Sequence, residues 1–392
     1  MKKHVVSLLL LWSVVFGVWA EKGFVIQGSV DGITPQSMIS LYRVDNGKRS
    51  LLDKAYVTRG RFKLTGKTAG STAEEVYIML SDKKSPSRTL ALWVLPGAKI
   101  KVFGDNRIAA LWTVESDVAE QKESNLYAAA VRPFLAEYWN YYPEKAKLET
   151  LYRDKNTPRE KRSAVRKQIN AITAKQDSIQ SLMYKAEIDI MQTAPVGDIW
   201  LMHLAQLAMV SRTQKNFPYK AELVNLYENR MTDVLKAKEY GVVARANLFQ
   251  RTVDVGDALV DADLYDLAGG VHHLSDYRGK YVLLDFWARS CAPCLAAMPE
   301  LAQLFANNSD SLVVVGLNLD DEDTWLQTSR EKKISWVNLN EKKGAAGLNV
   351  AYNVSSIPHY VLISPEGKVL SIFKGYKKNR IYNELKKYIA VK

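Results

Sequence analysis

Residues 280–294 read KYVLLDFWARSCAPC, and this stretch decides how the last third of the chain folds. The run from Lys280 to Trp287 is short and almost wholly apolar, which is typical of a buried strand. Cys291 and Cys294 follow it, and they are the 2 cysteines of the 392-residue chain. A bridge between cysteines three positions apart would constrain the unfolded chain very little. We therefore interpret the pair as redox-active rather than as a structural cross-link.

Composition limits the classes of protein to consider. Hydrophobic residues make up 47% of the chain and charged residues 24%, which is a globular mixture and excludes wholesale disorder. The 54 Lys and Arg against 42 Asp and Glu give a net charge of +12. Residues 251–392 hold 17 of each sign, so the excess charge belongs to residues 1–250. Two cysteines exclude a four-cysteine zinc site, and we expect no metal and no cofactor.

The N-terminus has the features of a secretory signal. Basic residues after Met1 are followed by an apolar run from Val5 to Trp19, and Ala20 fits a signal-peptidase site. The alternative is a retained membrane anchor, but the run is shorter than the ~20 residues that span a bilayer. We expect cleavage after Ala20 and an extracytoplasmic protein, in the bacterial periplasm. Nucleic acid is then excluded as a partner, whereas the basic residues allow peripheral membrane or envelope association.

Changes in pattern along the chain predict four parts. Residues 1–20 are the signal peptide, and residues 21–115 show short alternating strands between turns, typical of an all-β sandwich. Residues 116–250 are rich in Glu, Lys, Ala, Leu and Gln, and we expect a helical region. In residues 251–392 a strand, a helix, a second strand, a hairpin and a closing helix follow one another. That order predicts an α/β sheet covered on both faces.

Four separated features of residues 253–392 resemble the thioredoxin superfamily. They are the run Asp285-Phe286-Trp287-Ala288, the motif Cys291-Ala292-Pro293-Cys294, the dipeptide Ile357-Pro358 and the lead-in segment 253–274. Within the superfamily the chain looks like the exported thiol–disulfide oxidoreductases of the TlpA/ResA kind. The resemblance covers a little over a third of the chain, and it implies an α/β thioredoxin-like fold there.

The physical reading of the motif assigns a role to each cysteine. A strand that ends at Trp287 should deliver Cys291 to the first turn of a helix, where unpaired N–H groups and the helix dipole stabilise a thiolate. Cys291 is then the nucleophile. Cys294, one turn further on, is expected to be more buried and to resolve the mixed disulfide.

Other site residues come from the resemblance. It implies that Asp285 assists proton transfer at the buried cysteine, although a structural hydrogen-bonding acid remains the alternative. It also implies that Pro358 is cis, with the backbone of Ile357 pairing with an extended substrate. Trp287 and Pro293 are expected on the partner-facing surface.

The chain departs from the family at one place. The family often has Trp directly before the first cysteine, whereas this chain has Ser290, preceded by Arg289. Arg289 is expected to stabilise the Cys291 thiolate or to attract an acidic partner.

These observations predict an exported reductase of protein disulfides that receives electrons from an upstream thiol donor. Two other classes stay open. A peroxidase of the peroxiredoxin type needs a proline and a hydroxyl residue seven and three positions before the cysteine, where this chain has Leu284 and Ala288. A redox-inactive binding protein would use the β and helical parts to hold a ligand.

Overall fold

The computed structural model describes residues 23–34, 36–45, 48–81, 85, 89–214 and 216–391. The predicted signal peptide, residues 1–20, lies outside the described residues. The chain divides into two compact units, one of Met1–Arg43 with Leu51–Lys122 and one of Val44–Ser50 with Glu123–Lys392. Among the described helices, none is long and apolar enough to span a bilayer.

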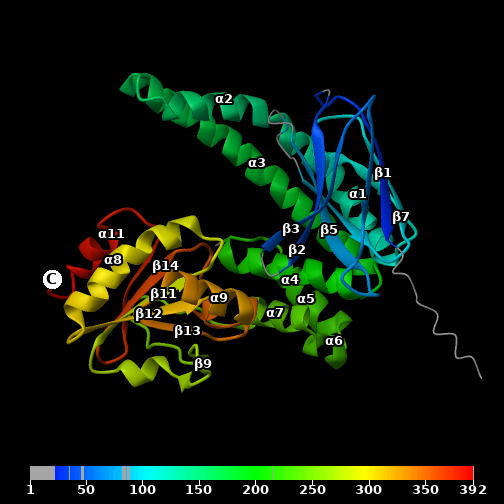
Figure 1. Cartoon of the computed structure of the whole chain (residues 1–392). Helices are drawn as coiled ribbons and strands as arrows, with labels where there is room; N and C mark the ends of the chain where they lie inside the picture. The colour runs from blue at the N-terminus through cyan, green and yellow to red at the C-terminus, as the bar shows by residue number, and fades with distance from the viewer. Residues whose placement is uncertain are drawn as a thin grey trace, which may run out of the picture. The chain divides into compact units, whose positions relative to one another are not determined.

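Two four-stranded sheets form the N-terminal β part (Figure 1). One sheet has the order β4-β1-β7-β8 and the other has the order β3-β2-β5-β6. Side chains alternate along β1, so that Phe24, Ile26 and Val30 are buried while Gln27 and Ser29 are exposed. The strands are β1 (Phe24–Val30), β2 (Met38–Asp45), β3 (Lys48–Tyr56), β4 (Arg61–Gly66), β5 (Glu74–Leu80), β6 (Thr89–Val94), β7 (Lys99–Gly104) and β8 (Thr113–Glu115). The prediction of N-terminal strands arranged in sheets is confirmed.

A helical region follows, as the composition predicted. Its helices are α1 (Ala119–Asn140), α2 (Tyr142–Arg153), α3 (Arg159–Thr193), α4 (Asp198–Thr213), α5 (Lys220–Arg230), α6 (Asp233–Ala237) and α7 (Glu239–Phe249). The apolar α4 buries Trp200, Leu204 and Ala208, and it packs against α7. Helices α2–α7 belong to the same compact unit as the rest of the chain to Lys392. The four boundaries drawn from the sequence stay predictions.

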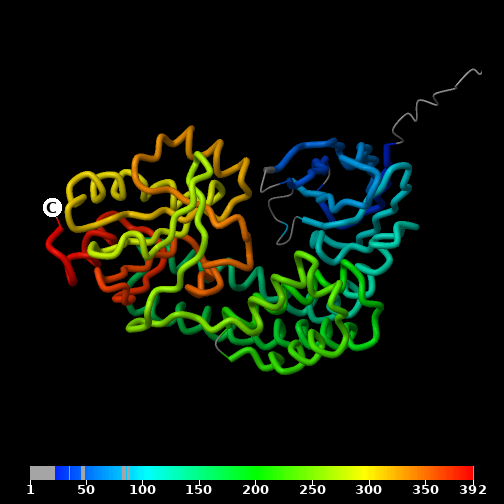
Figure 2. The backbone as a smooth tube through the Cα atoms, turned by 90° about the horizontal axis from the view of Figure 1, so that it is seen from below, coloured from blue at the N-terminus to red at the C-terminus, as the bar shows by residue number. Residues whose placement is uncertain are grey.

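The C-terminal part is a seven-stranded sheet with helices on both faces. Its order is β10-β9-β13-β12-β11-β14-β15, with β11 parallel to β12 and antiparallel to β14. Figure 2 traces the chain from the green α7 through the yellow and orange segments to the red C-terminus. The elements are β9 (Leu264–Tyr265), β10 (Val271–His272), η2 (Leu274–Tyr277), β11 (Tyr281–Trp287), α8 (Ala292–Asn308), β12 (Leu312–Asn318), α9 (Glu322–Lys332), β13 (Val337–Asn340), η3 (Gly344–Ala346), α10 (Leu348–Ala351), β14 (His359–Ile363), β15 (Val369–Lys374) and α11 (Arg380–Leu385). The predicted strand–helix–strand order, hairpin and closing helix are confirmed.

The central strand β11 is buried on both faces and separates two cores. Leu284 and Phe286 contribute to the core that includes α10. Leu283 contributes to the opposite core, together with Ala297 and Leu301 of α8. Because successive side chains of a strand point to opposite faces, the odd-numbered residues of β11 lie under α8. This alternation decides which side chains surround the cysteines.

Candidate active site

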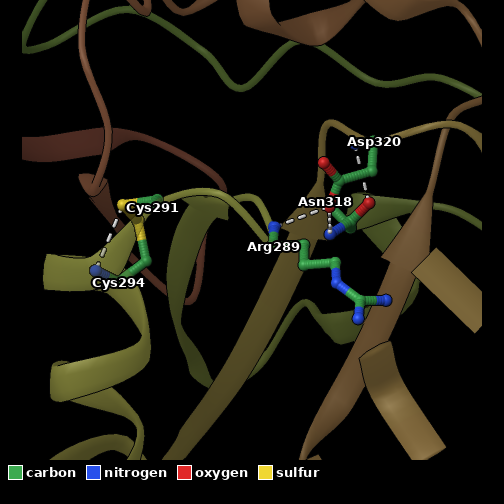
Figure 3. Close-up of a disulfide and its surroundings, with 5 residues drawn as sticks. All are labelled: Arg289, Cys291, Cys294, Asn318 and Asp320. Carbon is green, nitrogen blue, oxygen red and sulfur yellow. Dashed lines mark hydrogen bonds between the residues drawn. A yellow bond between two sulfur atoms is a disulfide. The ribbon is translucent and has the colours of Figure 1, made fainter. Parts of the chain in front are cut away.

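A disulfide joins Cys291 to Cys294 at the start of α8 (Figure 3). Cys291 is the N-cap residue of the helix, and its Sγ accepts a hydrogen bond from the Cys294 N–H at 3.1 Å. Cys291 is 8% exposed and Cys294 is 1% exposed. Strand β11 ends at Trp287, and the short connection that follows places the motif at the N-terminus of α8. The backbone N–H groups in the first turn of a helix have no acceptor within the helix, so they favour negative charge there.

The residues between the cysteines form the accessible edge of the motif. Ala292 and Pro293 are both exposed, and Pro293 lies in the first turn of α8. A proline fits there because its missing N–H would have no intrahelical acceptor. The more exposed Cys291 and this exposed dipeptide are the parts of the motif that a partner can contact.

The Ile357–Pro358 segment lies beside the disulfide in space. Its peptide bond is cis, as the resemblance implied. Ile357 packs against the cluster that contains Trp287, Cys291 and Cys294. The structure therefore brings together parts of the sequence more than sixty positions apart. Pro358 is buried, and its carbonyl oxygen accepts a hydrogen bond from Gly375 N–H at 2.8 Å.

Asp285 is a buried acid in the middle of β11. Its side chain lies on the face of the sheet that α8 covers. Leu283, two positions before it, packs on α8, and Trp287, two positions after it, packs on the cysteines. It is 3% exposed, and Oδ1 has no hydrogen-bond partner among the described residues. Burial raises the pKa of Asp285 to about 8, because the charged form is desolvated. At neutral pH the carboxyl group is therefore mostly protonated.

Arg289 does not face the disulfide. Its backbone N–H donates to Asp320 Oδ2 at 2.7 Å, and its guanidinium lies 3.5 Å from Glu331. Figure 3 shows its side chain extending away from Cys291. The expectation that Arg289 stabilises the Cys291 thiolate gains no support from this arrangement.

Two neighbouring acids follow β12 and make different contacts. The N-cap of α9 is Asp321, whose side chain accepts from Thr324 N–H at 2.9 Å. Asp320 instead fixes the loop that leads to Cys291, by accepting from Arg289 N–H and from Asn318 Nδ2.

Two neighbours of the site carry no local sequence signal. Trp325 of α9 is fully buried in the cluster around the cysteines. Tyr360 of β14 lies opposite Asp285 in the strand register, and burial together with the nearby Asp285 raises its pKa. Both reach the site only through strand pairing and helix packing. Among the described residues, no three His, Cys, Asp or Glu side chains lie together in a group able to hold a metal ion.

Comparisons with known proteins agree with this geometry. A family model described as thioredoxin-like matches residues 279–369. The thiol-disulfide oxidoreductase ResA of Geobacillus kaustophilus is 32% identical over 138 residues, which are 34% of this chain and 79% of that protein. The thioredoxin-like protein YneN of Bacillus subtilis is 32% identical over 127 residues, 31% of this chain and 73% of that protein.

A solved structure, the thioredoxin domain of a thiol-disulfide oxidoreductase from Bacteroides vulgatus, is 27% identical with a TM-score of 0.33. The alignment covers 36% of this chain and 100% of that one. The fold and the matched segment define a thioredoxin-like protein. The chain belongs to the family of thioredoxin-like thiol–disulfide oxidoreductases, and its relatives within that family include ResA.

Proposed function

We propose that the protein reduces protein disulfides by dithiol exchange through Cys291 and Cys294. The main observation in support is a disulfide at a helix N-terminus, with Ile357 of the cis-proline segment packed against it. The Cys291 thiolate attacks one sulfur of a substrate disulfide and expels the other as a thiolate. The Cys294 thiolate then attacks Cys291 Sγ, which releases the substrate dithiol and leaves the Cys291–Cys294 disulfide. Two electrons pass to the substrate, and an upstream dithiol donor must restore them.

Substrate contact is assigned to the surface around the disulfide. The exposed Pro293 and the half-buried Ile357 flank it. Trp287, which was expected on this surface, is instead 1% exposed and packs against the cysteines inside the protein, so it is not assigned a substrate contact. The backbone of Ile357 would pair with an extended segment of the substrate.

Export is part of the proposal and depends on the sequence before residue 21. We propose cleavage after Ala20 and action in the periplasm, where protein disulfides form and persist. N-terminal sequencing of the mature protein tests it, and an intact Met1 in protein recovered from the envelope would contradict it.

The direction of electron flow is tested by equilibrating the Cys291–Cys294 pair with glutathione buffers. A reductase is expected to give a potential below about −200 mV, since thioredoxin itself lies near about −270 mV. A potential near about −120 mV, typical of a strong oxidant, would contradict the reductase assignment.

The rival peroxidase is tested in parallel by peroxide consumption, which we expect to be slow because Leu284 and Ala288 supply no activating hydroxyl group.

A basic hollow in the β part favours a second role, in envelope association. The hollow has a volume of about 700 Å³ on the sheet that contains β4, β1 and β7. Arg61, Lys63 and Lys101 line it, together with the exposed rings of Tyr56 and Phe103. Cations attract carboxylate groups, and flat rings stack on the faces of sugars, so we assign the hollow to an anionic polysaccharide.

Replacing Lys63 and Lys101 by glutamine is expected to weaken binding of a galacturonic acid tetramer about tenfold or more, measured by calorimetry at low salt. Lys99→Gln is the matched control, because Lys99 is exposed on the same strand but does not line the hollow. Equal loss in the control, or equal binding of a neutral tetramer, would contradict a site specific for an anionic glycan.

A further inference from the structure

One arginine of the helical region reaches the segment that leads to the cis proline. Arg212, in the last turn of α4, donates from Nη1 to Asn353 Oδ1 at 3.0 Å and from Nη2 to the Val354 carbonyl oxygen at 3.2 Å. Its Nε donates to Asn247 Oδ1 of α7 at 2.7 Å. A single guanidinium therefore connects α4 and α7 to the chain just before Ser355.

The contact uses the shape of the guanidinium rather than charge pairing. All three acceptors are neutral oxygens, and in the described part of the chain no carboxylate forms an ion pair with Arg212. The planar fork can direct three donors at fixed acceptors at once, whereas a lysine ammonium acts as a compact point charge. The partner Asn247 is itself fixed, since its Nδ2 donates to Val243 and Ala345 carbonyl oxygens.

The segment after Val354 has few other attachments. Ser355 Oγ accepts from Lys374 Nζ at 2.6 Å, and Pro358 O accepts from Gly375 N–H at 2.8 Å. Both of these donors belong to β15 or to the residue after it, on the far side of the cis proline. Ser355 and Ser356 are exposed. On its N-terminal side the segment is attached through Val354, whose N–H donates to the Asn349 carbonyl oxygen at 2.8 Å and whose carbonyl oxygen accepts from Arg212. Arg212 supplies the side-chain contact from the helical region to this attachment.

We propose that Arg212 is a positioning residue that presents the backbone of Ile357 to an extended substrate beside the disulfide. The proposal rests on the proposed function, because it concerns how that same site pairs with protein substrates. The physical reason is the short distance along the chain. Ile357 is only three residues after Val354, whose carbonyl oxygen accepts the hydrogen bond from Arg212. The helical region then sets the geometry of the substrate-pairing segment and does more than separate two domains.

Arg212→Gln is expected to raise the KM for insulin and to lower kcat/KM about tenfold, the size expected for the loss of charge-assisted hydrogen bonds. Turnover of hydroxyethyl disulfide and the equilibrium with glutathione should stay at wild-type values. Small disulfides do not pair with Ile357, and the substitution leaves both cysteines in place. Arg212→Lys should behave like Arg212→Gln, because it keeps the charge and loses the fork.

Arg230→Gln is the matched control. Arg230 also donates from its guanidinium to two backbone carbonyl groups, those of Met191 and Ala194, but both lie within the helical region. This variant should keep the wild-type KM for insulin even where its melting temperature falls. An equal rise in KM in Arg230→Gln would overturn the proposal, because the effect would then reflect general loosening of the helices.

A second readout does not require activity. Amide hydrogen exchange of the peptide covering residues 353–360 is expected to quicken in both Arg212 variants and to stay unchanged in Arg230→Gln. If the wild-type protein fails to reduce insulin, the proposed function fails while this readout still tests the contact. If the wild type reduces insulin and neither KM nor exchange changes in the Arg212 variants, the positioning role is overturned. Should Arg212→Gln not fold, Arg212→Lys provides both measurements.

Discussion

Cys291→Ser is expected to abolish insulin reduction, with a loss of at least about a thousandfold in kcat/KM, because the hydroxyl group cannot supply the attacking thiolate. Ala292→Ser is the matched control, since it places a hydroxyl group at the next residue, the exposed first position of α8, and keeps both thiols. Activity near the wild-type value in Cys291→Ser would contradict the assignment of the nucleophile. Loss of activity in Ala292→Ser as well would show that the assay reports disturbance of the start of α8.

Cys294→Ser separates the two cysteines, because it leaves the nucleophile and removes the resolving thiol. The variant should accumulate mixed disulfides between Cys291 and its substrates, seen as adducts that dithiothreitol dissolves. The Cys291→Ser variant should capture none. If the wild type reduces insulin but neither variant forms adducts, the dithiol mechanism is contradicted. If the wild type, Cys291→Ser and Cys294→Ser are all inactive, the result favours the redox-inactive binding protein.

Asp285→Asn is expected to lower kcat/KM about a hundredfold at neutral pH, the usual size of a general acid–base contribution. The carboxylate of Asp285 would accept the proton of Cys294 as that thiol attacks the mixed disulfide. Since the pKa of Asp285 is raised to about 8, the wild-type rate should increase with pH up to about pH 8. This inflection should disappear in Asp285→Asn. An unchanged pH–rate profile would leave Asp285 as a structural acid.

The same substitution has a predicted effect on stability. The ordinary pKa of an aspartate in an unfolded chain is about 3.9, and folding raises that of Asp285 to about 8, so the native state binds more protons between these values. The free energy of unfolding of the wild type should therefore fall as the pH rises from about 4 to about 8. Relative to the wild type, Asp285→Asn should gain up to about 1.4 kcal/mol per pH unit in this window. Urea unfolding of both proteins at pH 5 and pH 8 measures it, and parallel curves would contradict the buried-acid interpretation.

Much of the α/β part could be predicted because its signals are local. The apolar run before Trp287 forms β11, and the motif that follows begins α8 with Cys291 as its N-cap. These features depend on hydrophobic pattern and on helix-end chemistry within a few residues. The cis bond before Pro358 followed from the resemblance rather than from any pattern in the residues.

The orientation of charged side chains could not be predicted in the same way. Arg289 is two positions from Cys291, yet its guanidinium turns toward Glu331. Asp320 holds the loop before the cysteines, and its neighbour Asp321 caps α9. A flexible side chain, or one at the end of a strand, often has several possible partners nearby. Small differences in distance and solvation decide which partner it contacts, and the sequence does not contain these differences.

The sequence by itself therefore determined the strand, the helix start, the two sulfur atoms and the class of chemistry. Only the tertiary structure decided what surrounds them, with Trp325 brought from α9 and Arg212 from α4. Neither residue has a distinguishing pattern around it, because each acts through contacts with chain segments far away in the sequence. Local signals can be read from a sequence because they arise between residues that are neighbours along the chain. Such long-range contacts exist only once the sheet and the helices have packed.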